Sequence, residues 1–167
     1  MRLLLPALLL SVPLSACASE TPGAVVAALW QASSHAPGVA ADTDRLRTLF
    51  RSDGIVAGGV VRDGKPVFRT MSAMDFVASQ RKARPHGFYE CEVAREVREH
   101  DRFATVYSVV ETRRDPTAAK ADYTGLNSIQ LYRDEQGWKI VSLYYQVGEP
   151  GAPVPLAGGK SGVCLGA

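Results

Sequence analysis

Two pairs of charged side chains have the spacing that chemistry at a site would need. Glu90 and Glu92 lie two residues apart in a segment expected to be a strand, so both carboxylates point to the same side of it. Two carboxylates on one face could perform general acid–base catalysis if the pKa of one of them were raised. The simpler interpretation, which we favour, is a solvated face of the strand.

Glu111 and Arg113 form the second pair, on a strand whose two faces are both rather apolar. They share one face with Tyr107, and because both faces are expected to be covered, the carboxylate of Glu111 needs a partner. We predict that Glu111 and Arg113 belong to a hydrogen-bonded structural network near the concave face or rim of the sheet. A ligand-binding or catalytic role and simple solvation are the alternatives.

Two further polar side chains are candidates for the wall of a pocket. Asn127 shares a face with Ile129, so it could donate a hydrogen bond to a ligand or to a neighbouring strand. Tyr144 aligns by simple alternation with Trp138, which is typical of a core stripe and sometimes of a pocket wall. The complete set of pocket candidates is Glu90, Tyr107, Glu111, Arg113, Asn127 and Tyr144.

No motif assigns a catalytic residue, a metal or a cofactor. His35, His86 and His100 fall in three separate loops or turns without the spacing of metal ligands. The sequence contains no Gly-x-Ser-x-Gly elbow, P-loop or dinucleotide fingerprint. With a net charge of +2 and no basic stripe, nucleic acid is not an expected partner.

The first sixteen residues are expected to be a signal peptide, because an apolar run from Leu3 to Leu14 follows Arg2. The run ends in Leu14-Ser15-Ala16-Cys17, which resembles the lipobox of bacterial lipoproteins and implies lipidation of Cys17. Residues 18 and 19 are alanine and serine, so the resemblance implies anchoring in the cell envelope, at the outer membrane if one is present, on its periplasmic side. The alternative is an ordinary signal peptide in which Cys17 is incidental. No other segment has 18 consecutive apolar residues.

Cys91 and Cys164 remain once Cys17 is lipidated. An even number of cysteines in an oxidising compartment indicates a disulfide between them. The alternative is a buried free Cys91 and a frayed C-terminal tail.

The order of predicted elements indicates an α+β fold. After a tether over residues 17–23, the pattern predicts a helix around Val25–Trp30 and a second helix that ends at Asp53-Gly54. A hairpin turns at Asp63-Gly64, and Ser72 begins a third helix. Four long antiparallel strands follow, and strands of this length imply a curved sheet packed on the helices, with a concave apolar pocket. The predicted domain spans residues 24–156, with an irregular tail over residues 157–167.

This element order resembles the NTF2-like superfamily, which includes the SnoaL-like cyclases and the ketosteroid isomerases. The segments Gly125–Leu131 and Gly137–Ser142 are similar to the last hairpin of a bacterial subfamily related to the DUF4440 proteins. The resemblance implies a cone-shaped fold of three helices and a short hairpin on a curved four-stranded antiparallel sheet, and frequent homodimers. The aspartate base and the oxyanion donors of ketosteroid isomerases cannot be placed on these strands.

Three functions therefore remain open. We favour a lipid-anchored module, without demonstrated chemistry, that binds a small hydrophobic ligand or a protein partner. The alternatives are an enzyme of the SnoaL or ketosteroid isomerase type that acts on a small apolar substrate, and a purely structural dimeric envelope protein. A deep pocket with an unpaired carboxylate or tyrosine would favour the enzyme, whereas a pocket filled by Trp30, Phe50 and Phe76 would favour the structural protein.

Overall fold

The computed structural model describes residues 21–148 and 153–166. The proposed signal peptide and Cys17 lie outside this range. In chain order the elements are α1 (Pro22–Ser33), α2 (Thr43–Leu49), β1 (Phe50–Arg62), β2 (Lys65–Ser72), α3 (Ala73–Ser79), β3 (Tyr89–His100), β4 (Phe103–Arg113), β5 (Tyr123–Asp134) and β6 (Gly137–Val147).

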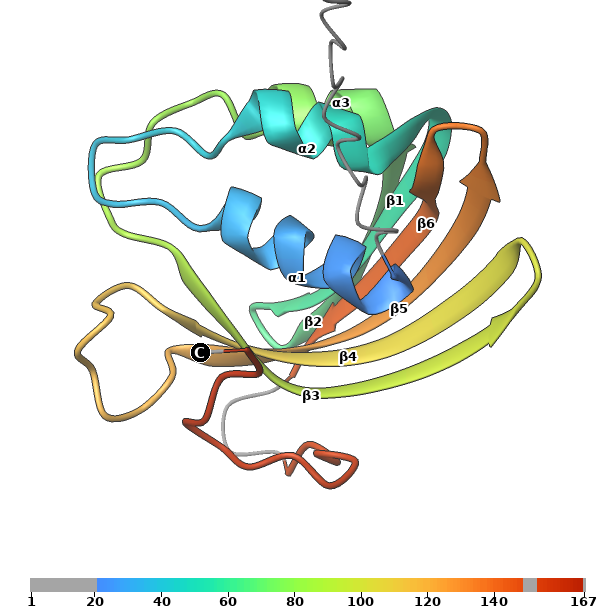
Figure 1. Ribbon diagram of the computed structural model, residues 1–167. Helices are drawn as coiled ribbons and strands as arrows, with labels where there is room; N and C mark the ends of the chain where they lie inside the picture. Colours follow the sequence, from blue (N-terminus) through green and yellow to red (C-terminus); the bar gives the residue numbers. More distant parts are fainter. Residues whose placement is uncertain (1–20, 149–152, 167) are drawn as a thin grey trace, which may run out of the picture.

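The strands form a single six-stranded mixed sheet in the order β2-β1-β6-β5-β4-β3 (Figure 1). All neighbours are antiparallel except β1 and β6, which pair in parallel. The α+β class is confirmed, but the expected four-stranded antiparallel sheet is wrong. The hairpin adds two strands to the sheet because β6, the last strand, offers its free edge to β1.

Local capping explains where the helices begin. The side chains of Thr21, Asp42 and Ser72 each accept a hydrogen bond from a backbone N–H in the first turn of α1, α2 and α3, respectively. The capping at Ser72 is confirmed, whereas the predicted end of the second helix at Asp53-Gly54 is wrong. The chain enters β1 directly at Phe50, and α1 begins at Pro22, inside the segment expected to be a tether.

The main core lies between the helices and the inner face of the sheet. Figure 1 shows α1 within the curve of the sheet, with α2 and α3 near the end of the sheet that holds β1. Fully buried side chains such as Leu29, Leu46, Ile129 and Ile140 fill this space. No helix of the described ranges is long and apolar enough to cross a membrane.

Two irregularities in strand pairing change which side chains face the helices. The register between β3 and β4 shifts between Glu92 and Ala94, so Glu92 and Arg95 both reach the inner face. The register between β5 and β6 shifts opposite Gln130 and Leu131, because Val141 has no partner on β5. Without this second shift, Tyr144 rather than Tyr145 would share a face with Ile140.

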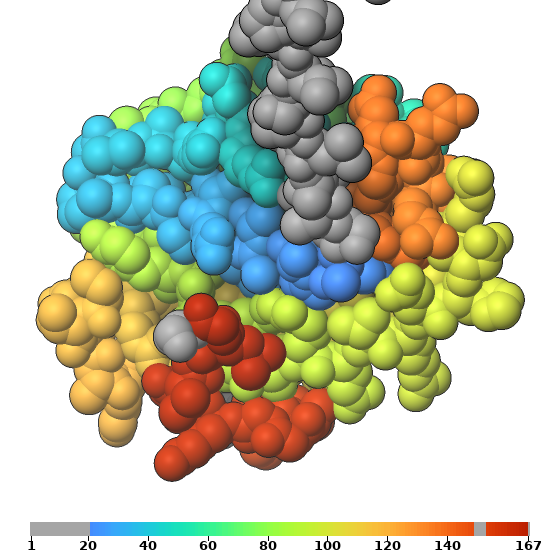
Figure 2. Space-filling view, viewed as in Figure 1, coloured from blue at the N-terminus to red at the C-terminus, as the bar shows by residue number. Residues whose placement is uncertain are grey.

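The outer face of the sheet carries a second, smaller core that the C-terminal segment covers. Cys91, Val93, Ala94 and Val109 pack there against Val154 and Leu156 of the segment 153–166, which we call the tail. In the structure a disulfide joins Cys91 to Cys164. Figure 2 shows the tail (red) against β3 (yellow-green), on the side of that strand away from α1 (blue).

Candidate functional site

A cavity of about 230 Å³ lies between the inner face of the sheet and the helices α1 and α3. Its walls are mostly apolar, with a small number of polar groups. Trp30 and Phe76 line it without filling it, and Phe50 instead packs against Phe76, with ring centroids 5.8 Å apart. The remaining lining residues are Leu29, Ser33, Gln80, Arg84, Phe88, Glu90, Val110, Thr112, Tyr123, Gly125, Asn127, Leu143, Tyr145 and Val147.

Strand register sets the polar groups of the cavity in two rows across the sheet. Glu90 of β3 pairs with Thr112 of β4, which pairs with Tyr123 of β5, so these three side chains share one row on the inner face. A second row contains Ser108, Asn127 and Tyr145. Between the two rows, Val110 pairs with Gly125, which has no side chain and leaves the floor of the cavity open. The register therefore produces one polar row at each side of an apolar floor.

Glu90 is the carboxyl group of the cavity, and it has little compensation there. Burial raises its pKa to about 8. A hydrogen bond from Thr112 Oγ1 to Glu90 Oε1 (3.3 Å) lowers the pKa, but by less than burial raises it. The backbone positions it firmly, because Glu90 N–H donates to Ser34 Oγ (3.0 Å), and Ser34 Oγ donates to the carbonyl of Trp30 at the end of α1 (2.8 Å). At neutral pH this side chain is therefore mostly protonated and able to donate a hydrogen bond.

Two tyrosines complete the polar lining. Burial raises the pKa of Tyr123, and the neighbouring charge of Glu90 raises it further, so this phenol stays protonated. Tyr145 lies across β1 at Gly58, where an added Cβ would stand only 2.2 Å from the tyrosine ring. Gly58 therefore makes room for Tyr145, which explains one residue of the glycine pair in β1.

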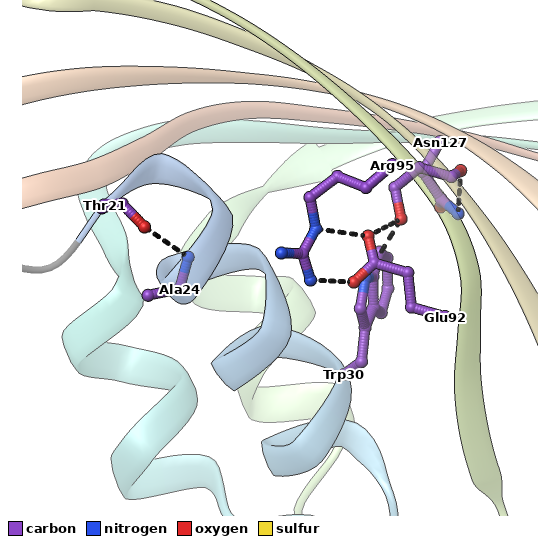
Figure 3. A network of polar contacts seen from close by, with 7 residues as sticks. Thr21, Ala24, Trp30, Glu92, Arg95 and Asn127 are labelled. Carbon is purple, nitrogen blue, oxygen red and sulfur yellow. Dashed lines mark hydrogen bonds and ion pairs between the residues drawn. The ribbon is translucent and has the colours of Figure 1, made fainter. Parts of the chain in front are cut away.

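A buried polar network supports the side of the cavity next to α1 (Figure 3). Arg95 pairs with both carboxylate oxygens of Glu92, through Nε at 3.0 Å and through Nη2. Ser108 Oγ donates to Glu92 Oε1 (2.6 Å) and accepts from Trp30 Nε1 (3.2 Å). Asn127 Nδ2 donates to the carbonyl of Ser108 (3.2 Å). The network fixes the two cavity-lining side chains Trp30 and Asn127, and Glu92, which is only 5% exposed, is not on a solvated face.

The rim of the cavity carries a positive charge. The Arg84 guanidinium lies 5.7 Å from the centroid of the Phe88 ring and donates through Nη2 to Gln80 Oε1 (3.4 Å). Phe88 in turn stacks on His35, and the two residues form an isolated antiparallel bridge. The rim is thus built from the end of α3, the loop after it and the start of β3.

The structure separates the predicted pocket candidates into two groups. Glu90 and Asn127 line the cavity. Tyr107, Glu111 and Arg113 lie on the outer face beneath the tail, so their expected place near the concave face is wrong: strand alternation separates them from Ser108, which faces inward. Tyr144 is 43% exposed, because the irregularity at Val141 turns it outward and Tyr145 inward.

Glu111 and Arg113 do form the expected network, on that outer face. Arg113 Nη2 donates to Glu111 Oε2 (2.8 Å), and Arg113 Nε donates to the carbonyl of Ala118 (3.1 Å). From the tail, Ser161 Oγ and the Gly162 N–H donate to the two carboxylate oxygens of Glu111 (2.5 and 3.0 Å). Although burial acts to raise the pKa of Glu111, these hydrogen bonds together lower it below its ordinary value.

Six polar residues of the cavity were not among the predicted candidates, namely Ser33, Gln80, Arg84, Thr112, Tyr123 and Tyr145. Thr112 and Tyr123 could have been found only from the pairing register, which places them beside Glu90. Tyr145 depends on the irregularity at Val141, for which the sequence has no clear signal. Within residues 21–148 and 153–166, no three His, Cys, Asp or Glu side chains gather as a metal site would require.

Comparisons with known proteins identify the fold. The chain resembles an NTF2-like protein of unknown function from Shewanella baltica OS155 (TM-score 0.55, 15% identity, 75% of this chain and 89% of that one). It also resembles an NTF2-like protein of unknown function from Methylobacillus flagellatus KT (TM-score 0.51, 13% identity, 75% and 87%). A third match is a proposed ketosteroid isomerase from Parabacteroides distasonis ATCC 8503 (TM-score 0.51, 10% identity, 77% and 89%).

At these identities the matches show an NTF2-like fold and nothing more specific. No family model matches the chain, and no curated protein matches it. The function must therefore be argued from the cavity itself.

Proposed function

We propose that this protein is an exported, lipid-anchored module that binds a small, mostly apolar molecule in its NTF2-like cavity. The observation that carries the proposal is the open space of about 230 Å³ beside a lone, underpaired carboxyl group, Glu90. A domain with a purely structural role would be expected to fill such a space with side chains, because interiors are normally close-packed.

The size and the lining of the cavity define what fits there. Pockets for drug-sized ligands usually have volumes of about 300–1,000 Å³, so this one suits a smaller molecule. Val110, Leu143 and the open floor at Gly125 offer apolar contact. The protonated Glu90 and the Tyr123 hydroxyl offer hydrogen bonds to an oxygen of the ligand.

Gly125 provides a direct test. An added Cβ would approach Asn127 Nδ2 no closer than 3.8 Å, so a larger side chain fits and extends into the cavity. We expect native mass spectrometry of the purified domain to show a co-purified small molecule on the wild type and on the matched control Gly125→Ala, but not on Gly125→Leu. Equal occupancy of all three proteins, with unchanged melting temperatures, would contradict binding in this cavity.

Acid–base catalysis is a second candidate, favoured by the raised pKa of Glu90 and the phenol of Tyr123 in the same row. Ionised Glu90 would take a proton from the carbon next to a ketone while Tyr123 donates to the ketone oxygen, and the proton would then return to the substrate. Deuterium uptake by cyclohexanone in D₂O, followed by NMR, tests this. Catalysis predicts a protein-dependent rate that rises through about pH 8 and is lost in Glu90→Gln; an unchanged rate in that variant would exclude it.

The lipid anchor rests on Leu14-Ser15-Ala16-Cys17 at the end of the apolar run. We expect Cys17→Ser to abolish labelling by a radioactive fatty acid and to release the protein from the membrane fraction. Equal label on the wild type and the variant would contradict the anchor. Several acyl chains, at about 0.8 kcal/mol for each buried methylene, would hold the domain stably at a membrane surface.

A homodimer is also part of the proposal, and the tail limits how it could form. The tail covers the outer face over β3 and β4, so we expect a second copy to use the part of this face over β2 and β6. Phe68 and Tyr144 lie there in contact with each other and are 63% and 43% exposed.

A further inference from the structure

We infer that the ligand carries a carboxylate head group, which lies at the rim of the cavity between Arg84 and the row formed by Glu90, Thr112 and Tyr123. This inference rests on the proposed binding function and names the chemical class of the ligand. The apolar body of the ligand would then extend inward over Gly125 toward Leu143.

The positive charge of Arg84 has no counter-charge among the described residues. Arg84 lines the cavity, and none of the ion pairs found among residues 21–148 and 153–166 includes it. Its contacts are the Gln80 side-chain oxygen and the Phe88 ring, both neutral. Arg84 is exposed to solvent at the rim, and its neutral contacts leave guanidinium donors available for a carboxylate, which the guanidinium matches in geometry.

Neutral hydrogen-bond donors lie in the same cavity, on the row that contains Glu90 and Tyr123. Glu90, Thr112 and Tyr123 lie side by side on β3, β4 and β5, and Arg84 lines the same cavity. Arg114 acts on Tyr123, but its own charge is balanced by Asp122, with 3.9 Å between Arg114 Nε and Asp122 Oδ1. A head group at this point would meet the positive charge of Arg84 and two neutral donors, the Tyr123 hydroxyl and the protonated Glu90 carboxyl, which suits an anion and repels an amine.

The number of charges favours a carboxylate over a phosphate. Arg84 can balance one negative charge, whereas a phosphate monoester carries close to two at neutral pH and would leave one uncompensated. The apolar wall made by Leu29, Val110 and Leu143 accounts for the rest of the molecule. The class is therefore a small acid with an apolar body.

Binding of such an acid depends on the protonation of Glu90. Besides Glu90, the groups near this row that carry or could carry charge are Tyr123 itself, from β5, Arg84 from the loop after α3 and Arg114 just after β4, both of which act on Tyr123. When Glu90 ionises, near pH 8, a second negative charge appears beside the head group and repels it. An alkyl carboxylate itself remains ionised from pH 6 to pH 10, because its own pKa lies near 4–5.

The experiment compares octanoate with octan-1-ol by displacement of a neutral fluorescent dye, in the full-length protein. At pH 6.5 we expect octanoate to bind about tenfold more tightly than octan-1-ol, the size of one charge-assisted hydrogen bond. Arg84→Gln should remove this difference, while the matched control Arg81→Gln, on another exposed arginine that does not line the cavity, should keep it. At pH 9.5 octanoate should lose affinity in the wild type but not in Glu90→Gln.

The outcomes separate the two proposals. If octanoate and octan-1-ol bind equally, compete with each other and are both excluded by Gly125→Leu, the carboxylate inference is overturned and the binding function stands. If Gly125→Leu binds both probes as the wild type does, or if neither probe binds the wild type, the proposed function fails and the inference fails with it. An octanoate preference that survives Arg84→Gln also overturns the inference.

Discussion

Glu90 and Glu111 lie on opposite faces of the same sheet, and their surroundings differ in the number of partners. Glu111 receives hydrogen bonds from Arg113, from Ser161 and from the Gly162 backbone, and its pKa is lowered. Glu90 receives one hydrogen bond from Thr112, and its pKa is raised to about 8. The same residue type is thus a compensated structural charge on one face and an uncompensated acid on the other.

This difference indicates where the molecule keeps space for a ligand. The part of the outer face over β3 and β4 is covered by the tail, with a disulfide and a saturated ion pair. The inner face is held by its own saturated network around Glu92, yet it leaves Glu90 beside an open volume. Underpaired polar groups that lie next to a cavity are more informative about function than buried ion pairs, which fold stability can explain.

The largest expected change in the free energy of unfolding comes from a substitution on the outer face. Glu111→Gln should lower the free energy of unfolding by about 3–5 kcal/mol at pH 7, because the buried charge of Arg113 loses its counter-ion. Urea unfolding measures it, with Glu135→Gln in the exposed turn before β6 as the control. Because the pKa of Glu111 is lowered by folding, its contribution is present above the ordinary glutamate pKa and disappears as pH falls through the lowered value. Wild type and variant should therefore converge in acid, and equal stability at pH 7 would contradict this account.

Removing the disulfide should have the next largest effect. The double variant Cys91→Ala/Cys164→Ala is expected to lose about 2–4 kcal/mol, because the bond restrains a separation of 73 residues in the unfolded chain. Combined with Glu111→Gln, the loss should be less than additive, since both changes release the tail. Binding in the cavity should remain unchanged in the double variant. A loss of ligand affinity without unfolding would show that the two faces are coupled.

The smallest expected change in the free energy of unfolding is a stabilisation, from a substitution at Glu90. Glu90→Gln should stabilise the protein at pH 9 and leave it nearly unchanged at pH 4. The rise of the Glu90 pKa from 4.5 to about 8 corresponds to about 5 kcal/mol at most, and because the side chain is partly exposed to solvent we expect about 2–3 kcal/mol. Folding raises the pKa of Glu90, so the folded state holds a proton that the unfolded state releases, and stability falls as pH rises from the ordinary glutamate value to about 8. A glutamine avoids this loss. Parallel pH profiles of thermal unfolding for the two proteins would show that Glu90 is not desolvated.

Much of the fold was predictable because its signals are local. The turn at Asp63-Gly64 and the cap at Ser72 are set by residues within one turn of the chain. Strand alternation also placed Glu111 and Ser108 correctly on opposite faces of β4. The parallel pairing of β1 with β6 was not predictable, because neither strand has a sequence feature that identifies its distant partner.

The candidate site was predictable only where alternation stayed intact. Glu90 and Asn127 belong to regular stretches of their strands, and both line the cavity. The irregularity at Val141 exchanged Tyr144 for Tyr145, and the shift after Glu92 brought Arg95 to the inner face. One extra residue in a strand reverses the faces of all that follow it, and apolar side chains on both faces conceal where it lies.

The pairing of β1 with β6 also has a consequence for the order of folding. β1 ends at Arg62 and β6 begins at Gly137, so the centre of the sheet joins segments that are far apart in the chain. Contacts of such long sequence separation form slowly, because a large loop must close before they contribute. The hairpin of β1 and β2 therefore has no neighbouring strand until β6 joins the sheet, so we expect the cavity to be among the last features to form.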